Sequence, residues 1–270
     1  MNTSGGVVLR STAVAVGLLF LSPLLYGIWI SFQTANRFFS GNGEMTLQNY
    51  VDAVEKMNFL RYLFNSLIVS GGVTILSLAT SIMAAYAFSR FEFRGRDLIF
   101  GLVVATLMIP GHITLIPNYL NFARVGLLDT YAGLILPAVA NGFATFFLRQ
   151  YFRGIPRSLD EAAWMDGANA WKVLYRVIIP MSKPAIYAMG LFIFLGEWNS
   201  YVWPLIATDS PDMLTLQIGL ARLYKMDAQE GLVNWPLVMA AATLTMLPVL
   251  LGFALVERHL VRGISMGAIK

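Results

Sequence analysis

The sequence predicts an all-α, polytopic membrane protein with six transmembrane helices. Composition is the first reason: 57% of the 270 residues are hydrophobic and 13% are charged, whereas soluble domains average about 25% charged. Distribution is the second, because the charges cluster and leave six long apolar runs. Cysteine is absent, which excludes disulfides and thiolate metal sites. These observations argue against a soluble globular enzyme.

Each of the six runs is long enough to cross a bilayer. A hydrocarbon core of about 30 Å needs about 20 apolar helical residues, and at 1.5 Å per residue even about 19 residues span it. We expect one transmembrane domain over residues 1–270. Its expected spans are residues 12–32, 63–88, 98–122, 130–148, 185–207 and 235–256.

Three of these spans have features of their own. The first is longer than the core of a cleavable signal peptide, about 7–15 residues, and lacks an A-x-A-like cleavage site, so we interpret it as uncleaved. The second is rich in Ser, Thr, Gly and Ala, which predicts close packing among helices, with a lipid-facing helix as the alternative. Pro110 and Pro117 break the third. That break either lines a solute path or is an ordinary proline kink.

The distribution of basic residues predicts the orientation. With the N-terminus inside, 13 of the 19 Lys and Arg residues lie on the inner side, and short cytoplasmic loops carry this excess. We therefore expect both termini, and the loop over residues 149–183, in the cytoplasm.

The 149–183 loop carries more local pattern than any other segment. Ser158 is a candidate N-cap with Glu161 three residues later, which is the capping-box spacing. Gly167 is placed to end that helix as its C′ residue. A second short helix is expected over 169–179, and Pro180 and Pro184 are expected to end it before the fifth span.

The first of these helices offers small and apolar groups at its surface. Ala162 and Ala163 permit close docking, while Leu159, Trp164 and Met165 could fill a partner's cleft. The alternative is an amphipathic helix pair that rests on lipid headgroups without a partner. The residues alone leave both interpretations open.

The same loop resembles a known family. Glu161-Ala162-Ala163-x3-Gly167-x9-Val177-x-Ile179-Pro180 resembles the EAA loop of permease subunits of binding-protein-dependent ABC importers. Val177 and Ile179 depart from that motif only by apolar exchange.

Other segments extend the resemblance over nearly the whole chain. Trp198-Asn199-x3-Trp203-Pro204-Leu205 and the tail Arg262-Gly263-x3-Gly267-Ala268-x-Lys270 resemble maltose-type sugar permeases. The stretches 128–134 and 197–199 are similar to glycerol-3-phosphate importer permeases.

The resemblance implies an ABC importer type I permease fold and a non-catalytic subunit that transmits energy. It implies a second permease, two ATP-binding subunits, an extracytoplasmic solute-binding protein, and a bacterial inner membrane. ATP and Mg²⁺ would bind the partner subunits, and this chain would bind no cofactor. The ATPase-coupling residues would be Glu161, Ala162, Ala163, Asp166, Gly167, Arg262, Gly263 and Lys270.

The expected solute is a sugar or a glycerol-3-phosphate-like compound, and the candidate path residues are polar or aromatic. Glu197 is the one acidic residue inside an expected span, and such residues usually face a cavity or a partner. It either lines the path or is a packed structural acid. For Trp203 we favour the interfacial aromatic belt. The candidate path residues are Glu197, Trp198, Asn199, Tyr201, Asn118 and Asn141.

Other classes of function have less support. A stand-alone secondary transporter or channel usually carries an inverted repeat, which we do not find. A membrane enzyme needs a reactive cluster, and none is visible. The glycine-containing tail fails phosphate-loop spacing. His112 and His259 are the only histidines and lie on opposite predicted sides, so we expect no metal site. The net charge of +4 gives no reason to expect nucleic-acid binding.

Overall fold

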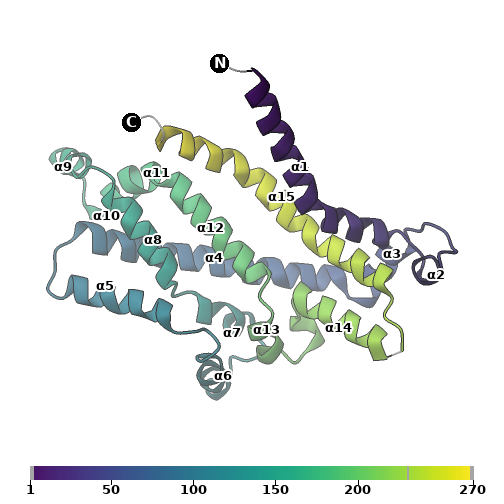
Figure 1. Ribbon diagram of the computed structural model, residues 1–270. Coiled ribbons are helices and arrows are strands. Elements are labelled where there is room, and N and C mark those ends of the chain that lie inside the picture. The colour runs from purple at the N-terminus through teal and green to yellow at the C-terminus, as the bar shows by residue number, and fades with distance from the viewer. Residues whose placement is uncertain (1–2, 230, 268–270) are drawn as a thin grey trace. The chain divides into compact units, whose positions relative to one another are not determined.

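Helices make up most of the described structure. The computed structural model describes the backbone of residues 3–229 and 231–267, and the side chains of residues 10–226, 228–229 and 231–254 (Figure 1). The α-helices are α1 (Thr3–Ser31), α2 (Ala35–Ser40), α3 (Gln48–Lys56), α4 (Phe59–Arg90), α5 (Arg96–Ala105), α6 (Leu115–Arg124), α7 (Tyr131–Ile135), α8 (Gly142–Arg153), α9 (Ser158–Met165), α10 (Ala170–Val173), α11 (Ile179–Met181), α12 (Lys183–Trp198), α13 (Val202–Ala207), α14 (Leu216–Gln229) and α15 (Trp235–Gly267). Short 3₁₀ turns and one π-helical segment, Leu174–Ile178, connect some of them.

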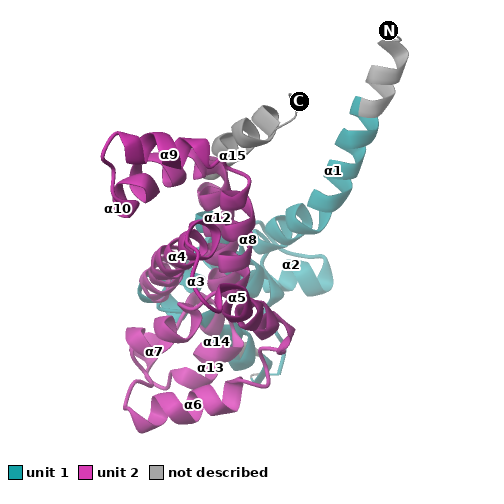
Figure 2. Cartoon of the chain, turned by 90° about the vertical axis from the view of Figure 1, so that its left-hand side faces the viewer, with its two compact units in different colours: residues 1–61, 219–248 teal, residues 62–218, 249–270 magenta. Residues whose placement is uncertain are grey.

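The chain divides into two compact units (Figure 2). One comprises residues 1–61 and 219–248, and the other comprises residues 62–218 and 249–270. The single domain expected over residues 1–270 stays a prediction.

In the first unit, α3 is tied to the end of α1 by buried polar contacts. The side-chain amide of Asn49 donates to the backbone carbonyls of Ser31 (2.8 Å) and Gln33 (2.7 Å). The hydroxyls of Ser31 and Tyr50 lie 2.6 Å apart. The bond to Ser31 satisfies a carbonyl that the end of α1 leaves without a partner in the helix, and the bond to Gln33 holds the segment that follows.

In the second unit, α4 packs through a stripe of small residues. Ser66, Ser70, Ser77 and Ser81 are all buried and recur at helical spacing along one face. The opposite face is exposed, as at Ile75. The small residues therefore serve helix packing, as the sequence predicted, and the other face is free to meet lipid.

Three of the expected spans are single helices that are long and apolar enough to cross a membrane. Within the described residues these are Arg10–Ser31, Phe59–Arg90 and Trp235–Ala254. Two bent helix pairs raise the number to as many as five, by length and composition alone. The bend is 47° between Tyr131–Ala138 and Gly142–Arg153, and 80° between Ala170–Met181 and Lys183–Trp198.

The expected third span, 98–122, is divided. Helix α5 ends at Ala105, a 3₁₀ turn follows, and α6 begins at Leu115. The turn between them contains Pro110, whose missing N–H cannot continue a helix. The total of six spans stays a prediction.

Gly133→Ala should destabilise the second unit because a Cβ atom there would overlap the carbonyl oxygen of Leu127. We expect a loss of about 1–3 kcal/mol in unfolding free energy, the usual cost of overpacking. Gly101→Ala is the matched control, since a Cβ there meets open space. Unfolding in detergent, followed by circular dichroism, measures both. Equal stability of the two variants would contradict the prediction.

Candidate functional site

Helix α9 begins without the predicted side-chain cap. Its N-cap is Arg157, and Ser158 is the first helical residue, so the capping box was wrong. Backbone carbonyls satisfy the first amides instead. Leu159 N–H donates to the Pro156 carbonyl (3.3 Å), and the N–H groups of the next two residues donate to the Arg157 carbonyl. With these donors already paired, Ser158 has no capping contact to make.

Gly167 ends the helix as the sequence predicted. Its φ of +77° lies in the left-handed region, and its N–H donates to the Trp164 carbonyl at 2.9 Å. The N–H of Ala168 donates to the Ala163 carbonyl at 2.9 Å. This pair of bonds is the Schellman arrangement, which favours glycine at the left-handed position.

The second helix of the loop runs past its expected end. Asn169 caps it by accepting from the Lys172 N–H at 2.9 Å. The helical path continues through Pro180 to Met181, so the prediction that Pro180 ends it was wrong. The π-helical segment lies immediately before α11, and Pro180 stands in the first turn of α11. Pro180 therefore lies inside a continuous helical path, directly after a π-helical segment, and such local irregularities are common where a proline interrupts the regular hydrogen-bond ladder.

A buried ion pair joins the loop to the end of α4. Arg90 Nε lies 2.7 Å from Asp160 Oδ2, and the two side chains are 4% and 3% exposed. Arg90 Nη2 also donates to the Ile155 carbonyl at 3.1 Å. Burial raises the pKa of the Asp160 carboxyl, and the charge of Arg90 opposes that change. The pair thus fixes position more than it adds net stability.

Hydrophobic packing and one hydroxyl complete this attachment. The Tyr86 hydroxyl of α4 donates to the Ala170 carbonyl at 3.1 Å. Beneath the loop lies a core from α4, α8 and the segment 155–185, whose buried members include Leu148, Phe152, Val173 and Ile178. Ala163 and Ala168 pack against it. Helices α9 and α10 are therefore built onto α4 and α8 as one body.

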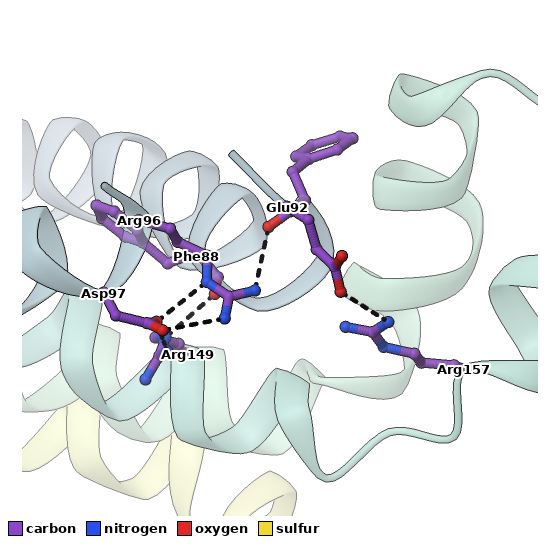
Figure 3. Close-up of polar contacts among 7 residues, drawn as sticks. Phe88, Glu92, Arg96, Asp97, Arg149 and Arg157 are labelled. Carbon is purple, nitrogen blue, oxygen red and sulfur yellow. Dashed lines mark hydrogen bonds and ion pairs between the residues drawn. The ribbon is translucent and has the colours of Figure 1, made fainter. Parts of the chain in front are cut away.

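Arg149 of α8 contacts the end of α4 and the start of α5, close to the attachment of the loop (Figure 3). Its Nε donates to the Phe88 carbonyl at 3.2 Å, and its guanidinium carbon lies 3.8 Å from the centre of the Phe100 ring. Asp97 lies 3.5 Å from Arg149 Nη2 and 3.1 Å from Arg96 Nε. The hydrogen bond from Arg96 lowers the pKa of Asp97.

On its outer side, α9 presents groups that have no partner within the described chain. Met165 is 88% exposed and Trp164 is 48% exposed. Glu161, Ala162 and Asp166 are also exposed. Among the described residues, no side chain pairs with the carboxylates of Glu161 or Asp166. The predicted coupling residues of α9 thus share a surface, apart from half-buried Ala163.

The predicted coupling residues of the C-terminal tail lie outside the residues whose side chains the structure describes. Arg262 and Gly263 belong to α15, but they lie outside the residues whose side chains are described. Lys270 lies outside the described residues altogether.

A second candidate site is a cavity of about 170 Å³ between α6, α7, α12 and α13. Two predicted path residues, Asn118 and Glu197, line it together. Ser200 and Trp203 also line it, as do Gly111 and Thr114 from the turn before α6. The indole of Trp203 donates to the Gly133 carbonyl at 3.1 Å, so Trp203, which we expected in an interfacial belt, stands in a cavity wall.

The other predicted path residues lie elsewhere and do not line this cavity. Trp198 is 2% exposed and stacks on Phe194. Asn141 caps α8 by accepting from the Ala144 N–H at 2.9 Å. Asn199 donates to the Leu195 carbonyl at 2.8 Å, and Tyr201 is 36% exposed. Trp198 and Asn141 therefore have structural roles in the chain itself.

Comparison with known proteins identifies the family. Residues 77–266 match the model of the binding-protein-dependent transport system inner membrane component. The chain belongs to this family. Members are permease subunits of ABC importers and are not themselves catalytic.

Individual relatives and a solved structure agree with this assignment. The permease is 30% identical to the arabinooligosaccharides transport system permease protein of Halalkalibacterium halodurans, over 96% of each chain. It is 34% identical to the sn-glycerol-3-phosphate transport system permease protein of Brucella abortus, over 82% of this chain and 80% of that one. It is also similar to a bacterial ABC transporter involved in the import of alginate, with a TM-score of 0.81, 24% identity, and coverage of 96% and 98%. That structure shows the same fold.

Asp160→Asn in the permease should be strongly destabilising because it leaves the charge of Arg90 buried without a counter-charge. We expect a loss of about 3–5 kcal/mol in unfolding free energy. Glu92→Gln is the control, since its ion pair with Arg157 is exposed and long, at 3.9 Å, and should change little. Chemical unfolding in detergent measures both. A double variant, Arg90→Met with Asp160→Leu, should recover most of the loss, and its failure to do so would count against the charge argument.

Proposed function

We propose that the 149–183 loop couples this permease to two ATP-binding subunits, and that α9 is the coupling helix. The observation that carries this is the division of α9 into two faces. Its outer face exposes Glu161, Ala162 and Met165, while Asp160 on its inner face is locked to Arg90. A helix that offers unpartnered groups outward and is fixed inward is suited to transmitting movement.

The transmission is a rigid-body movement. ATP and Mg²⁺ bind the partner subunits, whose closure displaces α9. Because α9 is joined to α4 and α8 through the ion pair and the shared core, its displacement moves those helices with it. Rocking of rigid elements between two arrangements is a common form of switching in proteins.

The complete importer contains, in this proposal, a second permease and an extracytoplasmic solute-binding protein. Family membership supports both. The 149–183 loop and both termini lie in the cytoplasm of a bacterial cell, as the excess of basic residues on that side favours. The chain is embedded in the membrane by the apolar helices.

The solute passes the cavity lined by Asn118 and Glu197, and is a sugar or a glycerol-3-phosphate-like compound. Both kinds of compound are supported by relatives, whose names include arabinooligosaccharides, diacetylchitobiose and sn-glycerol-3-phosphate. Polar groups converging on a cavity within apolar surroundings are typical of a ligand site.

Glu161→Lys should uncouple the importer without unfolding the permease because Glu161 is exposed and has no described partner. Gln150→Lys is the control. Gln150 is an exposed residue of α8 and lies outside the proposed coupling helix α9. We expect the ATP hydrolysis that the binding protein stimulates to fall about tenfold or more. A tenfold change corresponds to about 1.4 kcal/mol, which is roughly the free energy of one charge-assisted hydrogen bond. The assay uses the assembled importer in proteoliposomes. Normal stimulation by the Glu161→Lys importer would contradict the proposal.

The bend after α9 should depend on the left-handed conformation at residue 167. Gly167→Val should impair coupling, since a β-branched residue at a φ of +77° is strained. Gly167→Asn should retain most of it, because asparagine adopts this region more readily. Co-purification of the ATP-binding subunits and their stimulated hydrolysis measure the difference. Equal behaviour of the two variants would show that the bend does not matter.

A further inference from the structure

The start of α4 carries two buried polar side chains that bind a segment far away in the sequence. The Asn65 amide is fully buried and donates to the backbone carbonyls of Asp212 and Leu214, at 2.8 Å each. The Ser66 hydroxyl accepts from the N–H of Leu216, the first residue of α14, at 2.9 Å. Ser66 is 2% exposed. The two side chains therefore hold the chain that leads into α14 against α4.

The start of α7 binds the same segment. The Asp129 carboxylate accepts from the N–H groups of Asp209 and Ser210, at 3.1 and 3.2 Å. The Tyr131 hydroxyl donates to the side-chain oxygen of Asn65 at 2.6 Å. Polar contacts thus join the starts of α4 and α7 to each other and to the segment before α14.

Apolar packing surrounds these polar contacts. Val69 of α4, Leu134 of α7 and Ala207 of α13 form one buried cluster. All of these residues, and the first residues of α14, belong to the second unit. Breaking a buried hydrogen bond leaves its donor or acceptor unpaired, which is costly. The segment 207–216 is therefore held to α4 and moves with it.

Helix α4 is anchored at both of its ends. It has 32 residues and no proline, and at 1.5 Å per residue the anchors at Asn65 and Arg90 lie about 38 Å apart. Arg90 at the far end is paired with Asp160 of α9 at 2.7 Å. The helix is long and apolar enough to cross a membrane. One anchor thus lies at the side of α9 and the other at the opposite side.

We propose that Asn65 and Ser66 are positioning residues for transport that depends on the solute-binding protein. Through them the segment 207–216 and α4 move together, so that docking of the binding protein on the outer side is passed along α4 to α9. This rests on the proposed coupling role of α9 and extends it across the membrane. The family is binding-protein-dependent, and a signal between the two sides needs elements that are physically connected.

Ser66→Ala tests this connection with a small change, because it leaves the Leu216 N–H without its acceptor. Tyr131→Phe is a second variant, which removes the hydroxyl that binds Asn65. Ser77→Ala is the matched control. Ser77 is a buried serine of the same helix, and its hydroxyl has no hydrogen-bond partner among the described residues. Each importer is assembled in proteoliposomes, and ATP hydrolysis is measured with and without the binding protein.

The two variants should lose stimulation and keep the basal rate. We expect stimulation by the binding protein to fall about fivefold in Ser66→Ala and in Tyr131→Phe, since each loses one enclosed hydrogen bond. Hydrolysis without the binding protein, and recovery of the ATP-binding subunits, should stay within about twofold of the unmodified importer, because neither depends on the outer contacts. Ser77→Ala should be stimulated normally.

Normal stimulation in either variant overturns the proposal. An equal fall in basal and stimulated hydrolysis, or a loss of assembly, also overturns it, because a purely structural role predicts that result. Glu161→Lys, measured in parallel, separates this failure from that of the coupling helix. If Glu161→Lys loses stimulation while Ser66→Ala and Tyr131→Phe retain it, the connection along α4 fails and the coupling role stands. Normal stimulation in Glu161→Lys removes the coupling role, and with it the connection that ends at α9.

Discussion

The buried contact between Arg90 and Asp160 is the constraint on which the loop depends. Each charge is costly to bury alone, so neither residue can leave its place while the other remains. Arg90 is the last residue of α4, and Asp160 lies in the first turn of α9. The contact therefore sets the height and rotation of α9 on the helix ends beneath it. The exposed face that carries Glu161 follows from that rotation, since adjacent helical residues point about 100° apart.

Two acidic residues, one buried and one half-buried, have different surroundings in this unit. Asp160 has an arginine at 2.7 Å and is part of the mechanical connection. Glu197 has no such partner and lines a cavity, so its acceptor capacity is available to something that enters. Both side chains end in a carboxyl group, and their surroundings decide what each carboxyl group does.

Local patterns in the sequence predicted the long helices and the end of α9, but they failed at the Ser158 cap and at Pro180, and distant pairing was not predicted at all. The apolar runs gave the long helices, and Gly167 gave the end of α9, because each depends on neighbouring residues alone. The Arg90–Asp160 pair joins positions 70 apart, and Arg90 looked like an ordinary inner-side charge at the end of a span. Asn141 and Trp198 matched a solute path by residue type. Their use as a cap and a stacked ring depends on contacts that only the fold specifies.

The break in the expected third span, between α5 and α6, is both a bend at Pro110 and part of the wall of the cavity. Sequence left these as alternatives at Pro110. In the structure, the turn satisfies its own polar groups: Ile113 N–H donates to the Pro110 carbonyl at 3.0 Å, and the Thr114 hydroxyl donates to the Gly111 carbonyl at 2.9 Å. Gly111 and Thr114 also line the cavity. Non-helical backbone is tolerated at membrane depth where it borders such a space. The break therefore both redirects the chain into α6 and brings Asn118 to the cavity that holds Glu197.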